Sequence, residues 1–281
     1  MKLAFFVTIW PLAIFFACLS PASDATISEP FAQFLRNSFG AEEEKKIARR
    51  DLGTDGSFGG GKQRTKANKR PVIFVHGLTG LASDVNGIRR LFREKGGYKD
   101  GELYATTNGG GLKTVLRDSM KCDHVKKIRL LIRAVTQFTH SSQVDIIGYS
   151  MGSPTARKLL KNAILGGVCV DTGEKLGPPL TNLVHTFIGV GGANRGAFHL
   201  CRLFEWASFC NAVDGMRCHS KFLDDINSKA GYEASERIFT IRSTDDGTVG
   251  TVDCDGRSLH NYSHQMVMFG TGEQQLKLLS A

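Results

Sequence analysis

After its first 22 residues the sequence contains no apolar run that approaches the roughly 20 residues needed by a membrane-spanning helix. Its cysteines form no Cys-x-x-Cys pair, and we predict no metal site. No internal repeat is present, and no basic helix interleaved with aromatic residues indicates nucleic-acid binding. These absences leave one globular domain, for which we infer no metal, no nucleic acid and no protein partner.

The first 22 residues are the exception. Lys2 precedes two apolar runs, and Ser20-Pro21-Ala22 supplies small residues at the usual cleavage offsets. We therefore predict a signal peptide over 1–22, an N-terminal segment over 23–70 and the main domain over 71–281, in a secreted, extracellular protein. Export removes Cys18 and leaves an even set of six of the seven cysteines, which predicts disulfides without selecting their pairing.

The chain is basic, with a formal net charge of +9 that falls to +8 when Lys2 leaves with the signal peptide. A solvated basic surface accounts for this balance. A functional alternative is a salt-sensitive attraction to anionic lipid surfaces.

Short apolar runs alternate with helical patterns along most of the sequence. This alternation predicts an α/β fold with a doubly wound, mainly parallel sheet. Residues 53–70, rich in Gly, Lys and Arg, are expected to form an irregular surface segment. Strands are expected at 72–75, 103–106, 144–147, 183–190 and 237–242, and helices at 31–39, 83–94, 114–139 and after residue 150, with Lys126, Lys127, Arg129 and Arg133 in the solvent.

The alternation breaks between residues 195 and 236. Cys201, Cys210 and Cys218 lie there among several aromatic residues, which predicts a small cysteine-rich insertion. Such an insertion forms either a lid or lipid-facing rim, or a stapled surface loop with its own small core. The sequence leaves both alternatives open.

A serine stands where the run 144–147 meets the following helix, in Gly148-Tyr149-Ser150-Met151-Gly152. A strand that turns directly into a helix forces its central residue into strained backbone angles, and flanking glycines let neighbouring backbone pass. Pro154 suits the first turn of that helix, where its missing N–H costs nothing. The pattern predicts that Ser150 is a nucleophile exposed above the sheet.

Such a serine needs an imidazole to take its proton and a carboxylate to orient the imidazole. In this fold the acid and then the histidine follow the serine. Asp245 and Asp246 come directly after the strand at 237–242, although an ordinary Asp-Asp-Gly turn is the alternative. The pair supplies the candidate acids.

Two histidines, His260 and His264, remain after these acids. His264 is preferred because it precedes the apolar run 266–269, which can anchor it over the sheet. His76 comes before the serine and is expected to brace its own loop. The developing oxyanion needs two backbone N–H donors, which we assign to Met151, after the nucleophile, and Leu78, after the strand at 72–75.

These segments together carry a family resemblance. Residues 72–80, 148–152, 189–194 and 243–249, with His264, resemble the class 2 triacylglycerol lipases of the α/β-hydrolase superfamily, including secreted nematode members. The resemblance implies Ser150 as nucleophile, Asp246 as acid with Asp245 kept as an extra candidate, His264 as base, Leu78 and Met151 as oxyanion donors, and no cofactor.

We therefore expect a secreted serine ester hydrolase, a lipase that acts on acylglycerols, with a lipid–water interface as a possible place of action. Enzymatic alternatives are a phospholipase, a thioesterase or an esterase for small soluble esters. A non-catalytic lipid-binding protein on the same scaffold is the alternative of another class, because a fold does not fix a function.

Overall fold

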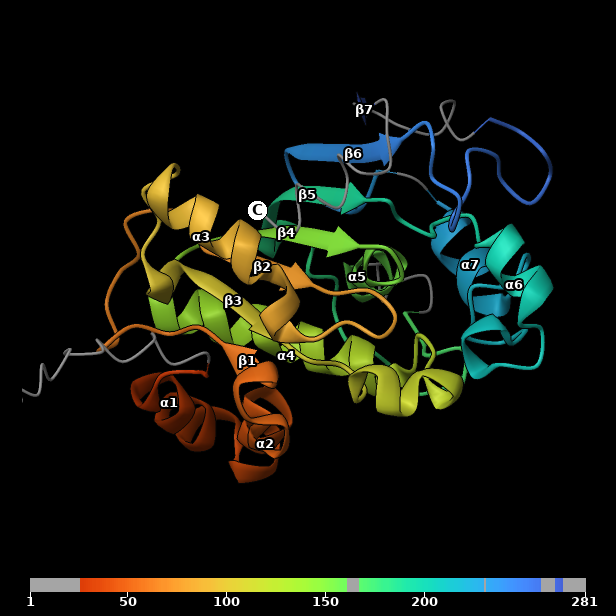
Figure 1. Ribbon diagram of the computed structural model, residues 1–281. Helices are drawn as coiled ribbons and strands as arrows, with labels where there is room; N and C mark the ends of the chain where they lie inside the picture. The colour runs from red at the N-terminus through yellow and green to blue at the C-terminus, as the bar shows by residue number, and fades with distance from the viewer. Residues whose placement is uncertain (1–25, 161–166, 230, 259–265, 270–281) are drawn as a thin grey trace, which may run out of the picture.

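The computed structural model describes residues 26–160, 167–229, 231–258 and 266–269. Within them seven strands form one sheet in the order β1-β3-β2-β4-β5-β6-β7 (Figure 1). Only β1 runs antiparallel, against β3; the other neighbours are parallel. The strands are β1 (Ser57–Phe58), β2 (Val72–Val75), β3 (Leu103–Thr106), β4 (Val144–Tyr149), β5 (Val184–Val190), β6 (Arg237–Ser243) and β7 (Met266–Phe269).

Helices flank this sheet and extend past its ends. Figure 1 shows α1 and α2 beside β1, and α6 and α7 beyond the ends toward which the strand arrows point. No helix of the described residues is long and apolar enough to cross a membrane. The α-helices are α1 (Glu29–Phe39), α2 (Ala41–Ala48), α3 (Asn86–Glu94), α4 (Cys122–Thr139), α5 (Gly152–Leu160), α6 (Phe198–Leu203) and α7 (Lys221–Asn227); short 3-10 turns include η1 (Arg50–Asp55), η2 (Ala82–Val85), η4 (Gly111–Arg117) and η7 (Ser208–Cys210).

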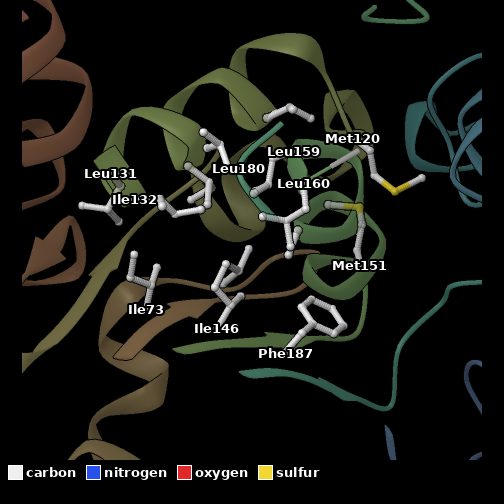
Figure 2. Packing of buried hydrophobic residues seen from close by; sticks show 14 of the residues in the cluster. Ile73, Met120, Leu131, Ile132, Ile146, Met151, Leu159, Leu160, Leu180 and Phe187 are labelled. Atoms are coloured by element: carbon white, nitrogen blue, oxygen red, sulfur yellow. The ribbon is translucent and has the colours of Figure 1, made fainter. Parts of the chain in front are cut away.

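Both faces of the sheet are buried, as the alternation of side chains along β2 shows. Ile73 and Val75 join the larger core beneath α4 and α5, whereas Val72 and Phe74 join a second core beneath α3. In Figure 2 Ile73, from β2, points with neighbouring strand residues toward the leucines of the helices. A strand buried on both faces reads as a continuous apolar run, which is why the run 72–75 predicts it correctly. The doubly wound, mainly parallel α/β fold is confirmed.

The order of the strands fixes where a site can form. The chain passes from β2 to β3 on one side and returns to β4 on the other, with Val75 opposite Gly148. In open α/β sheets this change of direction leaves a crevice at the carboxyl ends of the two strands. The loops that follow β2 and β4 meet there.

The helix expected at 114–139 begins later, at Cys122. Residues 111–117 form η4, and the backbone at 118–121 leaves the helix because Asp214 holds it. The Met120 N–H donates to the Asp214 carbonyl oxygen at 2.9 Å, and the Ser119 hydroxyl donates to the Asp214 carboxylate at 2.9 Å. A tertiary partner almost a hundred residues away is invisible in the local pattern.

Three further expectations are wrong. Lys127 is half-buried rather than solvated, because its ammonium donates to the Thr107 carbonyl oxygen at 3.0 Å. Arg129 is buried rather than solvated, because its guanidinium donates to the Leu159 and Pro178 carbonyl oxygens at the end of α5 and in the following loop. Ser57 and Phe58, within the segment expected to be irregular, form β1 and are fully buried against β3. A two-residue strand is too short to produce a periodic signal.

Three disulfides join the six cysteines of the described residues. Cys201–Cys210 closes a short loop inside the insertion, and Cys122–Cys169 ties the start of α4 to the segment after α5. Cys218–Cys254 connects the insertion to the loop after β6. The insertion is therefore a cross-linked body composed of α6, η7 and α7.

Candidate active site

Ser150 occupies the turn between β4 and α5. Its φ is +51°, in the left-handed region that residues other than glycine rarely adopt. Its N–H donates to the Val190 carbonyl oxygen at 2.9 Å, which keeps the turn attached to β5. Such a backbone costs of the order of 1–3 kcal/mol and persists only when the surrounding structure imposes it. The predicted strained turn is confirmed.

Glycines allow the two central strand ends to approach this serine. A Cβ on Gly152 would lie 2.2 Å from the Val75 carbonyl oxygen, and a Cβ on Gly77 would lie 2.8 Å from the Ser150 Cβ. Both distances are shorter than real Cβ atoms tolerate. The loop after β2 can therefore contact the serine only because these positions lack side chains.

The loops around Ser150 also carry the two candidate oxyanion donors. Leu78 follows Gly77, whose Cβ position lies 3.3 Å from the Ser150 Oγ, and Met151 follows the serine itself. Within the described part of the chain neither N–H donates to a protein acceptor. Two backbone N–H donors beside a serine hydroxyl are the groups from which an oxyanion hole is built.

His76 is buried at the end of β2 and braces this loop, as expected. Its Nε2 lies 2.7 Å from the Asn108 N–H and its Nδ1 lies 2.8 Å from the Gly77 carbonyl oxygen. Since the amide can only donate, Nε2 accepts and the proton sits on Nδ1. Burial lowers the pKa of His76 to about 4, so the ring stays neutral in this role.

The two candidate acids differ in their surroundings. Asp245 is exposed, whereas Asp246 is half-buried and its Oδ1 accepts the N–H groups of Thr248 at 3.0 Å and Val249 at 2.9 Å. The charge of Asp246 also raises the pKa of Tyr149, the residue that precedes the serine, although burial of that phenol is the larger cause. These contacts hold Asp246 in one orientation on the serine side and leave its Oδ2 outside them.

The candidate bases His260 and His264 lie outside the described residues. Met266, the next described residue, pairs with Thr240 as β7 joins β6 in parallel. The assignment of His264 as base therefore stays a prediction.

The family model for class 2 lipases matches residues 69–277, about three quarters of the chain. The chain belongs to the class 2 lipase family. It is therefore a carboxylic ester hydrolase. None of the curated proteins compared with the chain matches it, and the resemblance to nematode members stays a prediction.

A solved lipase structure shares the α/β fold of this chain. The mature lipase BlEst2 of Bacillus licheniformis is 16% identical, with a TM-score of 0.51 over 80% of this chain and 92% of that one. Its propeptide form is 13% identical, with a TM-score of 0.49 over 79% of this chain and 50% of that one. A monoacylglycerol lipase of Paleococcus ferrophilus is 12% identical, with a TM-score of 0.45 over 80% of this chain and 97% of that one.

A third segment of this class 2 lipase, residues 189–194, packs behind the nucleophile. The Ser153 hydroxyl donates to the Asn194 Oδ1 at 3.1 Å, and a Cβ on Gly192 would lie 2.7 Å from the Ser153 Cβ. The Ala193 N–H donates to the Ser150 carbonyl oxygen at 3.3 Å. The segment supports the start of α5 and so the position of the serine.

Sequence reasoning missed the residues that join α5 to the lipase insertion. Arg157 pairs with Glu233 at 2.7 Å, and Lys158 pairs with Asp225, on α7, at 2.6 Å. Both cations are buried, although a helix pattern places such residues in solvent. The sequence carries no signal that these two charges have partners about 70 residues away.

The insertion is not a loop with its own small core, and the alternative of a lid or lipid-facing rim stays a prediction. Cys210 and Phe209 are buried in the larger core that the insertion shares with the sheet, whereas Leu203 and Trp206 are 74% and 71% exposed. Phe204 lies between Trp206 and Phe209 in ring contact. The turn η7 contacts η4, and η4 exposes further apolar side chains. We call the exposed set the apolar rim: Phe198, Leu203, Phe204, Trp206, Leu112 and Leu116.

Proposed function

We propose that this class 2 lipase is a secreted enzyme that hydrolyses acylglycerol esters through a Ser150-His264-Asp246 triad. The observation that carries the proposal is the left-handed backbone of Ser150 at the turn from β4 into α5. That conformation presents a hydroxyl at the crevice between β2 and β4. No cofactor is part of the proposal.

In the proposed reaction the Ser150 Oγ attacks the ester carbonyl carbon and its proton passes to the imidazole of His264. The N–H groups of Leu78 and Met151 stabilise the oxyanion that forms. As the tetrahedral intermediate collapses, the imidazolium returns the proton to the departing alcohol oxygen. Water, activated by the same imidazole, then hydrolyses the acyl-enzyme and releases the fatty acid.

The surroundings of Asp246 support its choice over Asp245. Its Oδ1 is held by two backbone N–H groups, which fix the carboxylate while Oδ2 is outside these bonds. A fixed carboxylate orients an imidazole better than one on an exposed, freely rotating side chain. In the proposal Oδ2 accepts the Nδ1–H of His264.

The apolar rim supports a lipid–water interface as the place of action. Exposed apolar groups of this size are uncommon on a monomer unless they contact a partner or a lipid. Exposed Lys113, Arg117 and Arg202 alternate with them along η4 and α6, so the surface suits an anionic interface. The three disulfides support secretion. The proposed signal peptide, 1–22, lies outside the described residues, and the proposed catalytic domain spans 71–281.

The test compares the secreted protein with its Ser150→Ala and Ser141→Ala forms on emulsified triglyceride and on a short soluble ester. Loss of the nucleophile lowers turnover about 10⁶-fold, whereas Ser141→Ala, two residues beyond the end of α4, leaves it unchanged. If the rate of hydrolysis rises when the substrate concentration exceeds the solubility limit, the enzyme is a lipase. Equal activity of Ser150→Ala and parent contradicts the triad, and tight binding of labelled lipid without release of fatty acid indicates a lipid-binding protein.

A further inference from the structure

One peptide unit joins the Gly77 carbonyl to the Leu78 N–H, the proposed oxyanion donor. In a trans peptide these two groups point in opposite directions. The Gly77 oxygen is held by the His76 Nδ1–H at 2.8 Å and by the Gly80 N–H at 3.1 Å. Fixing this oxygen on one side fixes the direction of the Leu78 N–H on the other.

The ring of His76 is in turn held from behind. The Asn108 N–H donates to Nε2 at 2.7 Å, so any shift of the backbone at residue 108 rotates the imidazole. Asn108 and the neighbouring Thr107 are buried, and the Thr107 Oγ1 accepts the Ala82 N–H at 2.8 Å. The segment 107–109 therefore acts as the support of the histidine.

Arg49, far away in sequence, holds this support. Its Nη1 donates to the carbonyl oxygens of Thr107 and Gly109, each at 2.7 Å, on both sides of Asn108. The Lys127 ammonium donates to the same Thr107 oxygen at 3.0 Å. Two carbonyl oxygens that accept hydrogen bonds from one planar guanidinium cannot move independently.

The guanidinium is itself fixed in position. Its Nε and Nη2 donate to the two carboxylate oxygens of Asp51, both at 2.9 Å, in a bidentate pair. Arg49 adopts a left-handed backbone, with φ +45°, where α2 ends. Its position lies before residue 69, where the match to the family model begins. The bracing comes from the N-terminal segment of this chain.

We propose that Arg49 is a positioning residue for the oxyanion hole. It fixes the segment 107–109, which fixes the His76 ring, which directs the Leu78 N–H toward the crevice beside Ser150. The inference rests on the proposed function, because it requires Leu78 to be an oxyanion donor. Arg49 itself does not touch the reacting atoms.

The test measures kcat and KM on a soluble ester for Arg49→Ala and Arg49→Lys, per active site titrated with a phosphonate ester that labels Ser150. Removing one oxyanion donor costs about 10²–10³-fold in kcat, so a misdirected donor is expected to cost about 10–100-fold at Arg49→Ala. KM should stay within about twofold, because the donor acts in the transition state. Arg49→Lys should restore little, because an ammonium cannot bridge the carboxylate and both carbonyls.

The matched control is Arg50→Ala, which removes an exposed neighbouring arginine that pairs with Glu44. Asp51→Ala removes the carboxylate that pairs with Arg49 but leaves Arg49 in place. It gives a second variant if Arg49→Ala does not fold. A purely structural role lowers the number of titrated sites but leaves kcat per site unchanged, and that result overturns the inference.

A double-mutant cycle with His76→Gln tests the route. If Arg49 acts through His76, the double variant is no slower than His76→Gln alone; multiplied losses overturn the route. Absence of Ser150-dependent turnover in the parent instead refutes the proposed function, and the inference with it.

Discussion

The two sides of Ser150 are held by different kinds of interaction. On one side, the loop after β2 is braced by buried hydrogen bonds from His76, the segment 107–109 and Arg49. On the other, the insertion is held by disulfides and by the buried pairs of α5. Directional bonds suit a peptide that must be aimed within a few tenths of an ångström. Cross-links suit a small body that leaves part of its apolar side chains exposed.

The largest expected effect concerns the acid on the insertion side. Asp246→Asn should lower kcat about 10⁴-fold, because the amide no longer stabilises the correct tautomer of the base. Asp245→Asn is the matched control, since that neighbouring carboxylate is exposed. Steady-state kinetics on a soluble ester check both. Retained activity in Asp246→Asn, with loss in Asp245→Asn, reassigns the acid.

The buried pairs of α5 should dominate the stability of the insertion side. Glu233→Gln leaves the Arg157 guanidinium buried without its counter-charge and should lower the free energy of unfolding by about 3–5 kcal/mol. Chemical denaturation measures the change, with the exposed Glu236→Gln as control. A change of less than about 0.5 kcal/mol, the usual size for a surface substitution, would show that the pair does not anchor the insertion.

The braced side should instead be sensitive to acid. Burial, with the nearby charge of Lys127, lowers the pKa of His124 from 6.5 to about 3. Between these values the unfolded chain binds a proton that the folded protein excludes. The free energy of unfolding should therefore fall as the pH drops below 6.5, by up to roughly 1.4 kcal/mol per pH unit for this group.

Denaturant titrations of the parent and of His124→Gln between pH 7 and pH 4 check this expectation. The variant should show a weaker dependence, because glutamine does not titrate. His140→Asn, at an exposed left-handed position, should retain the parental dependence. His76 contributes in the same direction, with its pKa lowered to about 4 mainly by burial. Equal slopes in the parent and His124→Gln would contradict the account.

The smallest effect is expected at the apolar rim. Trp206→Ser removes a large exposed ring without disturbing a buried contact. Partition onto emulsified triglyceride should weaken about tenfold, equivalent to roughly 1.4 kcal/mol. Hydrolysis of a soluble ester by the same variant provides the control and should be unchanged. An equal loss on both substrates would indicate that the ring serves the catalytic centre.

The sequence predicts well what depends on neighbouring residues. The strained turn at Ser150 follows from glycines within two positions, and the buried strand 72–75 follows from its own apolar run. Arg49 was not predicted, because its partners, the Thr107 and Gly109 carbonyls, are backbone groups that any sequence supplies. The late start of α4 likewise depends on Asp214, which no local pattern connects to Met120.

The disulfide Cys218–Cys254 closes a covalent ring over 36 positions, and Asp246 lies inside it. Ser150 lies inside a different covalent ring, which Cys122–Cys169 closes over 47 positions. The nucleophile and the acid are therefore enclosed by separate cross-links. In a reducing compartment neither cross-link forms, so each of these two parts of the site depends on its own oxidation step during export.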